Sequence, residues 1–561
     1  MERITFETLL PRLQDYISKY AKECPEKVAM IDADDGSGVS YKKFDSLSDF
    51  FALRLRSMGI GKGDIIATSL PLLKEFVLLI YGAFKIGAIV APLDLRLKAH
   101  EIVRSIQLIN PKFYFFLGKT PIMDFRPMIE KVREECPQIS HWVQFTIDPS
   151  ELIKGAMTIT QMMDKKKLIL LKLKDILTGS LKRAKSNVGK KDPVLIIFTT
   201  GSTGKPKPAL LSHENIIVQN LGLYAAFDMK ETDRMIVNLP NSHVGCMTEQ
   251  LMTTFFGGGT NILIRVFDPL KTLQAIEKYK ATIFGQIPTQ FNLEWALPDF
   301  KKYDYSTLRF AIYGGSMVTT KFLEQLRKMA PRMGTGLGLT ESAGFVTYTD
   351  PDVSLEEIAR SVGKALPFSP VTIREPMKEN GLAGKTLPPD GVGEICIEGP
   401  QVFLGYYKMP EETAKAISKD GVCYTGDMGS IDSKGYLQIK GRSKFMIKQK
   451  GYNVYPADVE EFISKMDKVG ESAVVGLGHE IFSEGILAFV KPKPGAKIAA
   501  EEVMEHCKGM ASYARPLHVE IFNEAFPMTR VNKVDYLALK EIGMKIVEKL
   551  RSQGGWDKKK T

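Results

Sequence analysis

The densest set of chemically useful residues is a loop rich in glycine, hydroxyl and lysine side chains. It reads Phe-Thr-Thr-Gly-Ser-Thr-Gly-Lys-Pro-Lys over residues 198–207 and directly follows the apolar run Val194–Ile197. Glycines let backbone N–H groups crowd round an anion, hydroxyl groups donate further hydrogen bonds, and lysines supply positive charge. The loop therefore suits a polyphosphate, although taken alone it also fits a surface turn. It is not a Walker A loop, because only two residues separate Gly201 from the Gly-Lys pair and Pro206 replaces the magnesium-binding Ser/Thr.

Further motifs follow this loop along the chain. They are Gly314-Gly315-Ser316, Gly-Leu-Gly-Leu-Thr-Glu at 336–341, Tyr424-Thr425-Gly426-Asp427, Gly441-Arg442-Ser443-Lys444 followed by residues 447–456, and Pro527–Lys533. In sequence and order, the loop and these motifs resemble the adenylate-forming superfamily, which includes acyl-CoA synthetases, adenylation domains of peptide synthetases and firefly luciferase. The resemblance covers residues 199–533. It implies an enzyme that joins a carboxylic acid to AMP with release of pyrophosphate and then passes the acyl group to a thiol.

The resemblance implies roles for the residues of the first motifs. The β- and γ-phosphates of ATP would be held by Thr199, Thr200, Gly201, Ser202, Thr203, Gly204 and Lys205. The remainder of the nucleotide would contact Gly314, Gly315, Ser316, Gly336, Leu337, Gly338 and Thr340, with Thr340 near the α-phosphate. Glu341 would hold Mg²⁺, a hard cation that prefers carboxylate and phosphate oxygens. Asp427 would accept hydrogen bonds from the ribose hydroxyls, and Arg442 would contact the ribose or a phosphate.

The resemblance also implies that a mobile C-terminal domain rotates between two poses. Lys533 would bridge the carboxylate and the α-phosphate in the first pose, and Lys448 would face the active site in the second. The domain would rotate about Lys444. The tunnel for the pantetheine arm of coenzyme A would be lined by Lys450, Gly451 and Tyr452, and the gate between ATP and the acid would be His243. Taken alone, His243 also fits a structural role, and Lys533 fits a solvated surface lysine.

Three positions depart from the family pattern. Pro208 replaces the usual glycine and removes a donor N–H just past the phosphate loop. Leu337 replaces the aromatic residue that usually stacks on adenine, so we expect apolar packing there. Asn532 replaces the glycine before the catalytic lysine, and asparagine tolerates left-handed backbone better than most residues. None of these changes removes a charge that the chemistry needs.

The acid pocket is expected around residues 243–248, 257–259, 286–289 and 314–317. These residues are small or apolar, and none is a lysine, arginine or aspartate that could pair with a charged tail. The sequence therefore predicts a medium- or long-chain fatty acid or an aryl acid. Because the chain ends soon after the catalytic-lysine motif, without a carrier-protein domain, coenzyme A is the expected acceptor. Two alternatives stay open: an enzyme that loads a separate carrier protein, and a non-catalytic homologue that binds a nucleotide or acyl ligand.

The elements that must position these residues alternate between strand and helix patterns. Strands are expected at Val28–Asp32, Ile65–Leu70, Phe113–Leu117 and Val194–Thr199, with a helix after the N-cap candidate Ser40. This alternation predicts an α/β fold with mostly parallel sheets. We expect a large N-terminal AMP-binding domain of layered α/β subdomains over 1–440, closed by a β-rich subdomain near 376–398. A hinge at 441–444 and a smaller mobile α+β domain over 445–561, with a helix from Pro456, would follow.

Composition excludes several other classes of protein. The 561 residues are 44% hydrophobic, which argues against disorder, and the most apolar stretch, 65–92, is broken too often by charge and proline for a spanning helix. The N-terminus lacks the pattern of a signal peptide. Six scattered cysteines without a CxxC pair indicate a reduced, cytoplasmic protein.

The net charge of +11 is concentrated in one segment. Residues 164–191 hold ten Lys/Arg and two Asp, a net +8. The segment has no aromatic residues for base stacking and matches no nucleic-acid-binding motif, so nucleic acid is not expected as a partner. Two interpretations of residues 165–191 stay open: a solvated amphipathic helix, or a peripheral contact with an anionic membrane.

Overall fold

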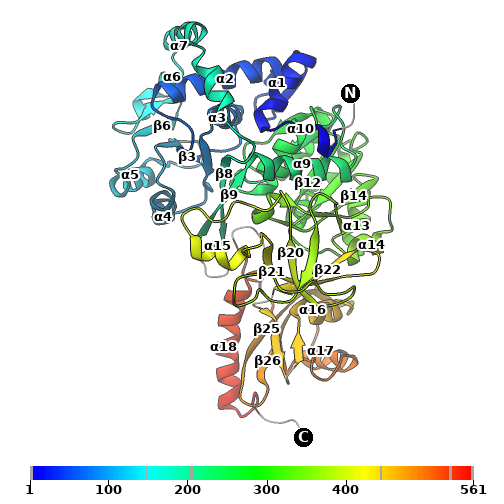
Figure 1. The fold of residues 1–561 in the computed structure, drawn as a ribbon. Coiled ribbons are helices and arrows are strands. Elements are labelled where there is room, and N and C mark those ends of the chain that lie inside the picture. Colours follow the sequence, from blue (N-terminus) through cyan, green and yellow to red (C-terminus); the bar gives the residue numbers. More distant parts are fainter. Residues whose placement is uncertain are drawn as a thin grey trace. The chain divides into compact units, whose positions relative to one another are not determined.

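The computed structural model describes residues 4–146, 148–200, 206–442, 445–450, 452–529 and 534–557 (Figure 1). The contacts divide the chain into two compact units. The first unit comprises Met1–Val371, Met377–Ala383 and Ile397–Cys423, and the second comprises Thr372–Pro376, Gly384–Cys396 and Tyr424–Thr561. Helices and strands alternate through most of the chain, which confirms the predicted α/β class.

Within its described residues, the first unit contains two sheets of seven strands. One has the order β7-β6-β5-β3-β4-β8-β9, and all neighbours are parallel except the last pair. Its strands are β3 (Ile65–Ser69), β4 (Ile89–Pro92), β5 (Phe113–Leu117), β6 (His141–Phe145), β7 (Met157–Thr158), β8 (Pro193–Thr200) and β9 (Pro206–Ser212). The apolar stretch 65–92 forms β3, helix α3 (Lys74–Phe84) and β4. Among the described residues, no helix combines the length and the apolar composition needed to cross a bilayer.

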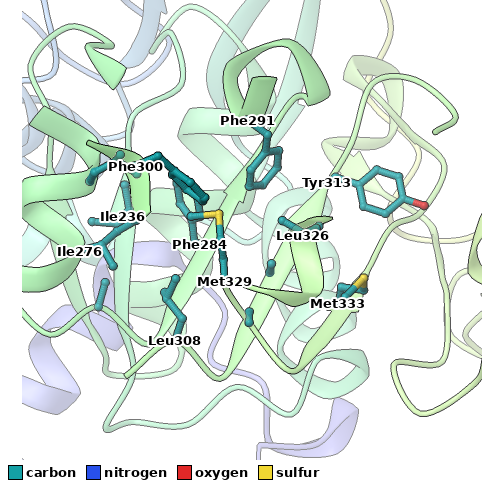
Figure 2. Close-up of a cluster of buried hydrophobic side chains, with 14 of the residues drawn as sticks. Ile236, Ile276, Phe284, Phe291, Phe300, Leu308, Tyr313, Leu326, Met329 and Met333 are labelled. Atoms are coloured by element: carbon teal, nitrogen blue, oxygen red, sulfur yellow. The ribbon is translucent and has the colours of Figure 1, made fainter. Parts of the chain in front are cut away.

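The other sheet has the order β14-β13-β12-β10-β11-β1-β2, and again only the last pair is antiparallel. Its strands are β1 (Val28–Asp32), β2 (Gly38–Ser40), β10 (Arg234–Val237), β11 (Thr260–Leu263), β12 (Ile283–Gln286), β13 (Phe310–Tyr313) and β14 (Arg332–Gly334). Side chains of these strands pack against α11 (Pro269–Lys278), α12 (Pro288–Trp295) and α13 (Thr320–Arg327). Figure 2 shows this core, with Phe284, Phe291, Leu326 and Met329 among its buried residues.

Local signals in the sequence explain where the long helices start. Helix α2 (Tyr41–Ser57) begins after Ser40, whose side chain accepts a hydrogen bond from the Lys43 amide, as the sequence predicts. Helix α9 (His213–Ala226) is capped in the same way by Ser212. The remaining helices of this unit are α1 (Leu13–Glu23), α4 (Ala99–Ile109), α5 (Arg126–Glu135), α6 (Ile159–Met162), α7 (Lys165–Thr178), α8 (Ser180–Ser186), α10 (Thr253–Phe256), α14 (Leu355–Arg360) and α15 (Pro410–Ala416).

The C-terminal part of the second unit is a sheet of order β24-β23-β26-β25, with β27 beside β26 and helices on both faces. Its elements are β23 (Ile447–Gln449), β24 (Tyr452–Val454), α16 (Pro456–Ser464), β25 (Val469–His479), β26 (Ser483–Pro492), α17 (Ala500–His506), β27 (His518–Ile521) and α18 (Tyr536–Ser552). Side chains alternate along β25. Val474 therefore packs in the core of α16 and α17, whereas Ala473 and Val475 pack in the core of α18. The helix predicted to start at Pro456 is confirmed.

The β-rich region forms a second sheet, of order β19-β20-β21-β22. Its strands are β19 (Val371–Arg374), β20 (Gly393–Ile397), β21 (Cys423–Ile431) and β22 (Leu437–Arg442). The contacts group most of this sheet with the C-terminal segment. The hinge expected at 441–444 is the point about which the C-terminal domain would rotate between its two poses. This hinge stays a prediction.

Candidate active site

The phosphate loop connects two antiparallel strands of the first unit. Thr200 at the end of β8 pairs with Pro206 at the start of β9, and Thr199 pairs with Lys207. The loop residues between them, Gly201, Ser202, Thr203, Gly204 and Lys205, lie outside the described residues, as does the side chain of Thr200. The described strands thus fix where the loop begins and ends.

The edge of β9 that does not pair with β8 is covered by the segment 404–407. The Tyr407 amide donates to the Pro208 carbonyl at 2.8 Å, and the Leu210 amide donates to the Gly405 carbonyl at 3.0 Å. Pro208 itself lies opposite Phe198 in the ladder, so β9 tolerates the proline that replaces the family's glycine. This pairing brings Tyr406 to the strand that follows the phosphate loop.

A chain of polar contacts links this strand to Glu341, the expected metal ligand. The Tyr406 hydroxyl donates to Glu341 Oε1 at 2.6 Å, and Lys207 Nζ lies over the Tyr406 ring, 5.1 Å from its centroid. Lys207 also forms an ion pair with Glu412 on α15. The hydrogen bond orients the Glu341 carboxylate towards Tyr406, whose segment pairs with the strand that follows the phosphate loop.

The surroundings of Tyr406 keep its hydroxyl available as a hydrogen-bond donor to Glu341. Burial and the nearby Glu341 charge raise the pKa of Tyr406, so this hydroxyl stays protonated and keeps its role as a donor. Hydrogen bonds from Lys207 and Lys415 lower the pKa of Glu412 to about 2. Tyr406 and Glu412 could not be found from the sequence, because neither belongs to a motif and Tyr406 is 65 residues from Glu341.

The remaining nucleotide motifs of the first unit lie at the carboxyl edge of its second seven-stranded sheet. Gly314, Gly315 and Ser316 follow β13, and residues 335–338 follow the neighbouring β14. Ligands of open parallel sheets commonly bind at this edge. Gly315 has a φ of +90°, which favours glycine.

Tight packing fixes the segment of Gly336, Leu337 and Gly338. A methyl group on Gly336 would lie 1.9 Å from the Thr347 carbonyl, so only glycine fits there. Leu337 is buried, and its amide donates to the Thr347 hydroxyl at 2.9 Å. After the short strand β15 (Gly338–Leu339), a 3₁₀ turn over Thr340–Ser342 carries Thr340 and Glu341.

His243 follows β10, which lies beside β12 in the same sheet, so it reaches the same edge. Its ring is anchored by the Gly245 amide, which donates to Nδ1 at 3.1 Å, and the residue is exposed. A π-helical segment, Gly245–Met252, begins two residues after it. The gate role of His243 stays a prediction.

In the second unit, the two expected ribose ligands lie together. Asp427 on β21 pairs with Arg442 on β22, and Arg442 Nε contacts Asp427 Oδ1 at 2.7 Å. The ion pair holds the carboxylate and the guanidinium side by side, in an arrangement that presents both an acceptor and donors to a diol.

The structure describes some of the other predicted site residues of the second unit. Lys448 is exposed on β23, Lys450 Nζ donates to the Ser512 carbonyl at 3.2 Å, and Tyr452 stacks on Tyr513 with centroids 4.3 Å apart. Lys444, Gly451 and Lys533 lie outside the described residues. The hinge, tunnel and catalytic roles of these residues stay predictions.

Comparisons with known proteins show which family the chain belongs to. The AMP-binding enzyme family matches residues 17–407, and the AMP-binding enzyme C-terminal domain matches residues 458–533. The medium-chain fatty-acid–CoA ligase of Escherichia coli is 27% identical over 94% of this chain and 90% of its own length. The indoleacetate–CoA ligase of Aromatoleum aromaticum is 28% identical over 93% of this chain and 96% of its own.

A solved structure extends the likeness to the fold. The ATP-bound MatB from Rhodopseudomonas palustris has a TM-score of 0.76 at 26% identity, covering 95% of this chain and 99% of that protein. Family, relatives and fold agree over nearly the whole length. The chain therefore belongs to the AMP-binding enzyme family, and within it to the acyl-CoA synthetase type.

Proposed function

We propose that this protein activates a carboxylic acid with an uncharged fatty or aryl tail, using ATP and Mg²⁺, and transfers the acyl group to coenzyme A. The observation that carries the proposal is Glu341, oriented by Tyr406, whose segment pairs with the strand that follows the phosphate loop. A carboxylate oriented there is suited to bind a cation that is shared with the phosphates of ATP.

The two steps need charge neutralisation and positioning. In the first, a carboxylate oxygen of the acid attacks the α-phosphorus of ATP, the bond to the β-phosphate oxygen breaks, and pyrophosphate leaves. In the second, the thiol of coenzyme A loses its proton and attacks the acyl carbon, and AMP leaves. Thr199–Lys205, Thr340 and Lys533 would hold the phosphates in the first step, while Asp427 and Arg442 would hold the ribose.

The residues present fit magnesium. Mg²⁺ usually binds through one or two carboxylates together with substrate phosphates, and Glu341 supplies such a carboxylate. When bound, Mg²⁺ would neutralise charge on the phosphates. Lys444 would serve as the hinge of the rotation, Lys448 would face the site in the second pose, Lys450, Gly451 and Tyr452 would line the coenzyme A tunnel, and His243 would gate the acid. The scattered cysteines favour a cytoplasmic place for the enzyme.

A panel of acids tests the proposal. We expect ATP–pyrophosphate exchange with medium- or long-chain fatty acids or aryl acids, and thioester formation when coenzyme A is added. A preference for amino acids or dicarboxylates would contradict the uncharged tail. Exchange without thioester formation would favour a carrier-loading enzyme, and no exchange with any acid would favour a non-catalytic homologue.

We further propose that α7 binds an anionic membrane surface. Five of its large apolar residues, Ile169, Leu170, Leu173, Ile176 and Leu177, are 55–87% exposed and recur at the spacing of a single helix face. The opposite face, with the buried Leu168, packs against α2, and Lys172 lies over the Phe50 ring of α2 at 4.9 Å. Figure 1 shows α7 at the edge of the first unit, away from the sheets.

The lysines around the exposed apolar face of α7 favour an anionic partner. Lys165, Lys167 and Lys174 are exposed on α7 and flank the apolar stripe, and the exposed Lys166 lies at the N-terminal end of the stripe. An apolar stripe bordered by lysines is typical of helices that lie in the interface of an anionic bilayer. An enzyme placed there would receive fatty acids from the membrane.

Vesicle co-sedimentation tests this contact. We expect salt-sensitive binding to phosphatidylserine-containing vesicles, reduced at least about tenfold when these four lysines are changed to Gln. The matched control changes four exposed lysines elsewhere in the unit, Lys278, Lys301, Lys321 and Lys328, and should bind as the unmodified protein does. Absence of binding at low salt would leave α7 as a solvated helix.

A further inference from the structure

Glu249 is a carboxylate that none of the steps above uses, and it lies among three glycines. A methyl group on Gly344 would lie 2.8 Å from Glu249 Oε1, and one on Gly338 would lie 3.2 Å from the same atom. A methyl group on Gly245 would lie 3.6 Å from Oε2. Glycine at all three positions lets the backbone approach the carboxylate, whose residue is only half-buried.

The three glycines belong to the segments that carry the candidate site. Gly245 follows His243 by two residues and donates its amide to that ring. Gly338 precedes Thr340 and Glu341, and Gly344 comes after them in the strand β16 (Gly344–Phe345), which pairs with β15. The Glu249 carboxylate therefore lies where the acid-gate segment meets the nucleotide segment.

Gln219 on α9 supplies a second polar group at the same place. Its side chain is fully buried, and its Nε2 has no hydrogen-bond partner among the described residues. The other amide atom, Oε1, accepts a hydrogen bond from Asn220 at 2.8 Å, so Nε2 is the donor that is left over. This Nε2 lies 3.1 Å from the methyl position on Gly344, the position that Glu249 Oε1 also approaches. A buried donor without a partner is costly, which indicates that a ligand completes it.

The electrostatics of Glu249 agree with a role in binding a neutral group. Burial raises the pKa of Glu249 to about 7, although a hydrogen bond from the Phe345 backbone lowers it. Tyr348, an ionisable residue whose pKa the Glu249 charge helps to raise, donates its hydroxyl to the Phe345 carbonyl. The carboxylate thus keeps an acceptor atom available. Glu249 lies in the π-helical segment Gly245–Met252, and such segments are frequent at functional sites.

We propose that Glu249 and Gln219 form the polar end of the acid-binding site and select carboxylic acids whose uncharged tail bears a hydroxyl group. A hydroxyl can donate to Glu249 and accept from Gln219 at the same time, whereas an ammonium group would meet the Gln219 N–H as a second donor. This inference rests on the proposed acid-activating function. It narrows the expected substrates to hydroxylated fatty acids or phenolic acids.

Matched pairs of acids test the inference. The pairs are octanoate with its terminally hydroxylated analogue, and phenylacetate with para-hydroxyphenylacetate, so that the two arms separate a fatty from an aryl substrate. For one pair, we expect the hydroxylated acid to have the higher kcat/KM for thioester formation. Glu249→Leu should lower the ratio of hydroxylated to plain acid at least about tenfold, while Glu249→Gln, which can still accept, should lower it less.

A matched control separates this effect from a change in folding. Glu460 is also half-buried, with a pKa raised to about 7, but it lies in the second unit and accepts from Tyr536. Glu460→Gln should leave the ratio unchanged, and thermal unfolding of all variants checks that they fold. Calorimetric binding of the four acids in the presence of a non-hydrolysable ATP analogue gives a second ratio that needs no turnover.

These readouts distinguish the two proposals. Tighter binding of the hydroxylated acids that Glu249→Leu removes would support the role of Glu249, even when no thioester forms. In that case only the proposed reaction would fail. A ratio of kcat/KM and of Kd that is the same in the unmodified protein and in Glu249→Leu would overturn the role of Glu249, whatever the turnover.

Discussion

Replacing Lys533 by alanine should lower the rate of acyl-adenylate formation by about 10²- to 10³-fold, the usual loss when one group that stabilises developing charge is removed. The first step brings two anions together, the acid carboxylate and the α-phosphate, and a lysine that bridges them offsets their repulsion. ATP–pyrophosphate exchange measures this step. The second step, thioester formation from chemically prepared acyl-AMP, should be nearly unaffected, because we propose that Lys533 acts in the first pose.

The control for this variant is Lys545→Ala on α18, an exposed lysine in the same unit. It should exchange at the rate of the unmodified protein. If Lys533→Ala retains its exchange rate, or if both steps fall equally, the assignment of Lys533 to the adenylating pose is wrong.

Replacing Glu341 by alanine should lower kcat/KM for adenylation by about 10²-fold or more and raise the Mg²⁺ concentration needed for half-maximal rate. The variant removes the carboxylate that Tyr406 orients. Titrating Mg²⁺ at fixed ATP in the exchange assay measures both effects.

Two further variants show whether the loss comes from the metal. Tyr406→Phe removes only the hydroxyl that donates to Glu341, and should cost about tenfold, the usual effect of one hydrogen bond to a charged group. Glu356→Ala removes an exposed carboxylate on α14 and should change nothing. An unchanged Mg²⁺ dependence in Glu341→Ala would contradict the metal role.

Much of the fold could be predicted from local sequence signals. Ser40 has the side chain that caps a helix, and the strands β1, β3, β5 and β8 are short apolar runs that end at turns. Their alternation with helical patterns was enough to predict mostly parallel sheets. The motif residues could also be found from local sequence, because they lie in short segments with unusual composition.

The contacts between distant segments could not be predicted in this way. Tyr406 reaches Glu341 because the segment 404–407 pairs with β9, and nothing in its local sequence indicates that pairing. Glu249 was missed although it directly follows the expected pocket segment 243–248, since a glutamate on a helix pattern is usually solvated. Its significance depends on Gly338, Gly344 and Gln219, which only the folded chain brings together.

The central claim is that one active site couples cleavage of ATP between its α- and β-phosphates to thioester formation. The most direct test is the product balance when the full chain is incubated with ATP, Mg²⁺, coenzyme A and the best acid of the panel. We predict AMP, pyrophosphate and acyl-CoA in equal amounts, with no product when the acid is left out. Formation of ADP and phosphate, or ATP binding without AMP formation with every acid, would contradict the account.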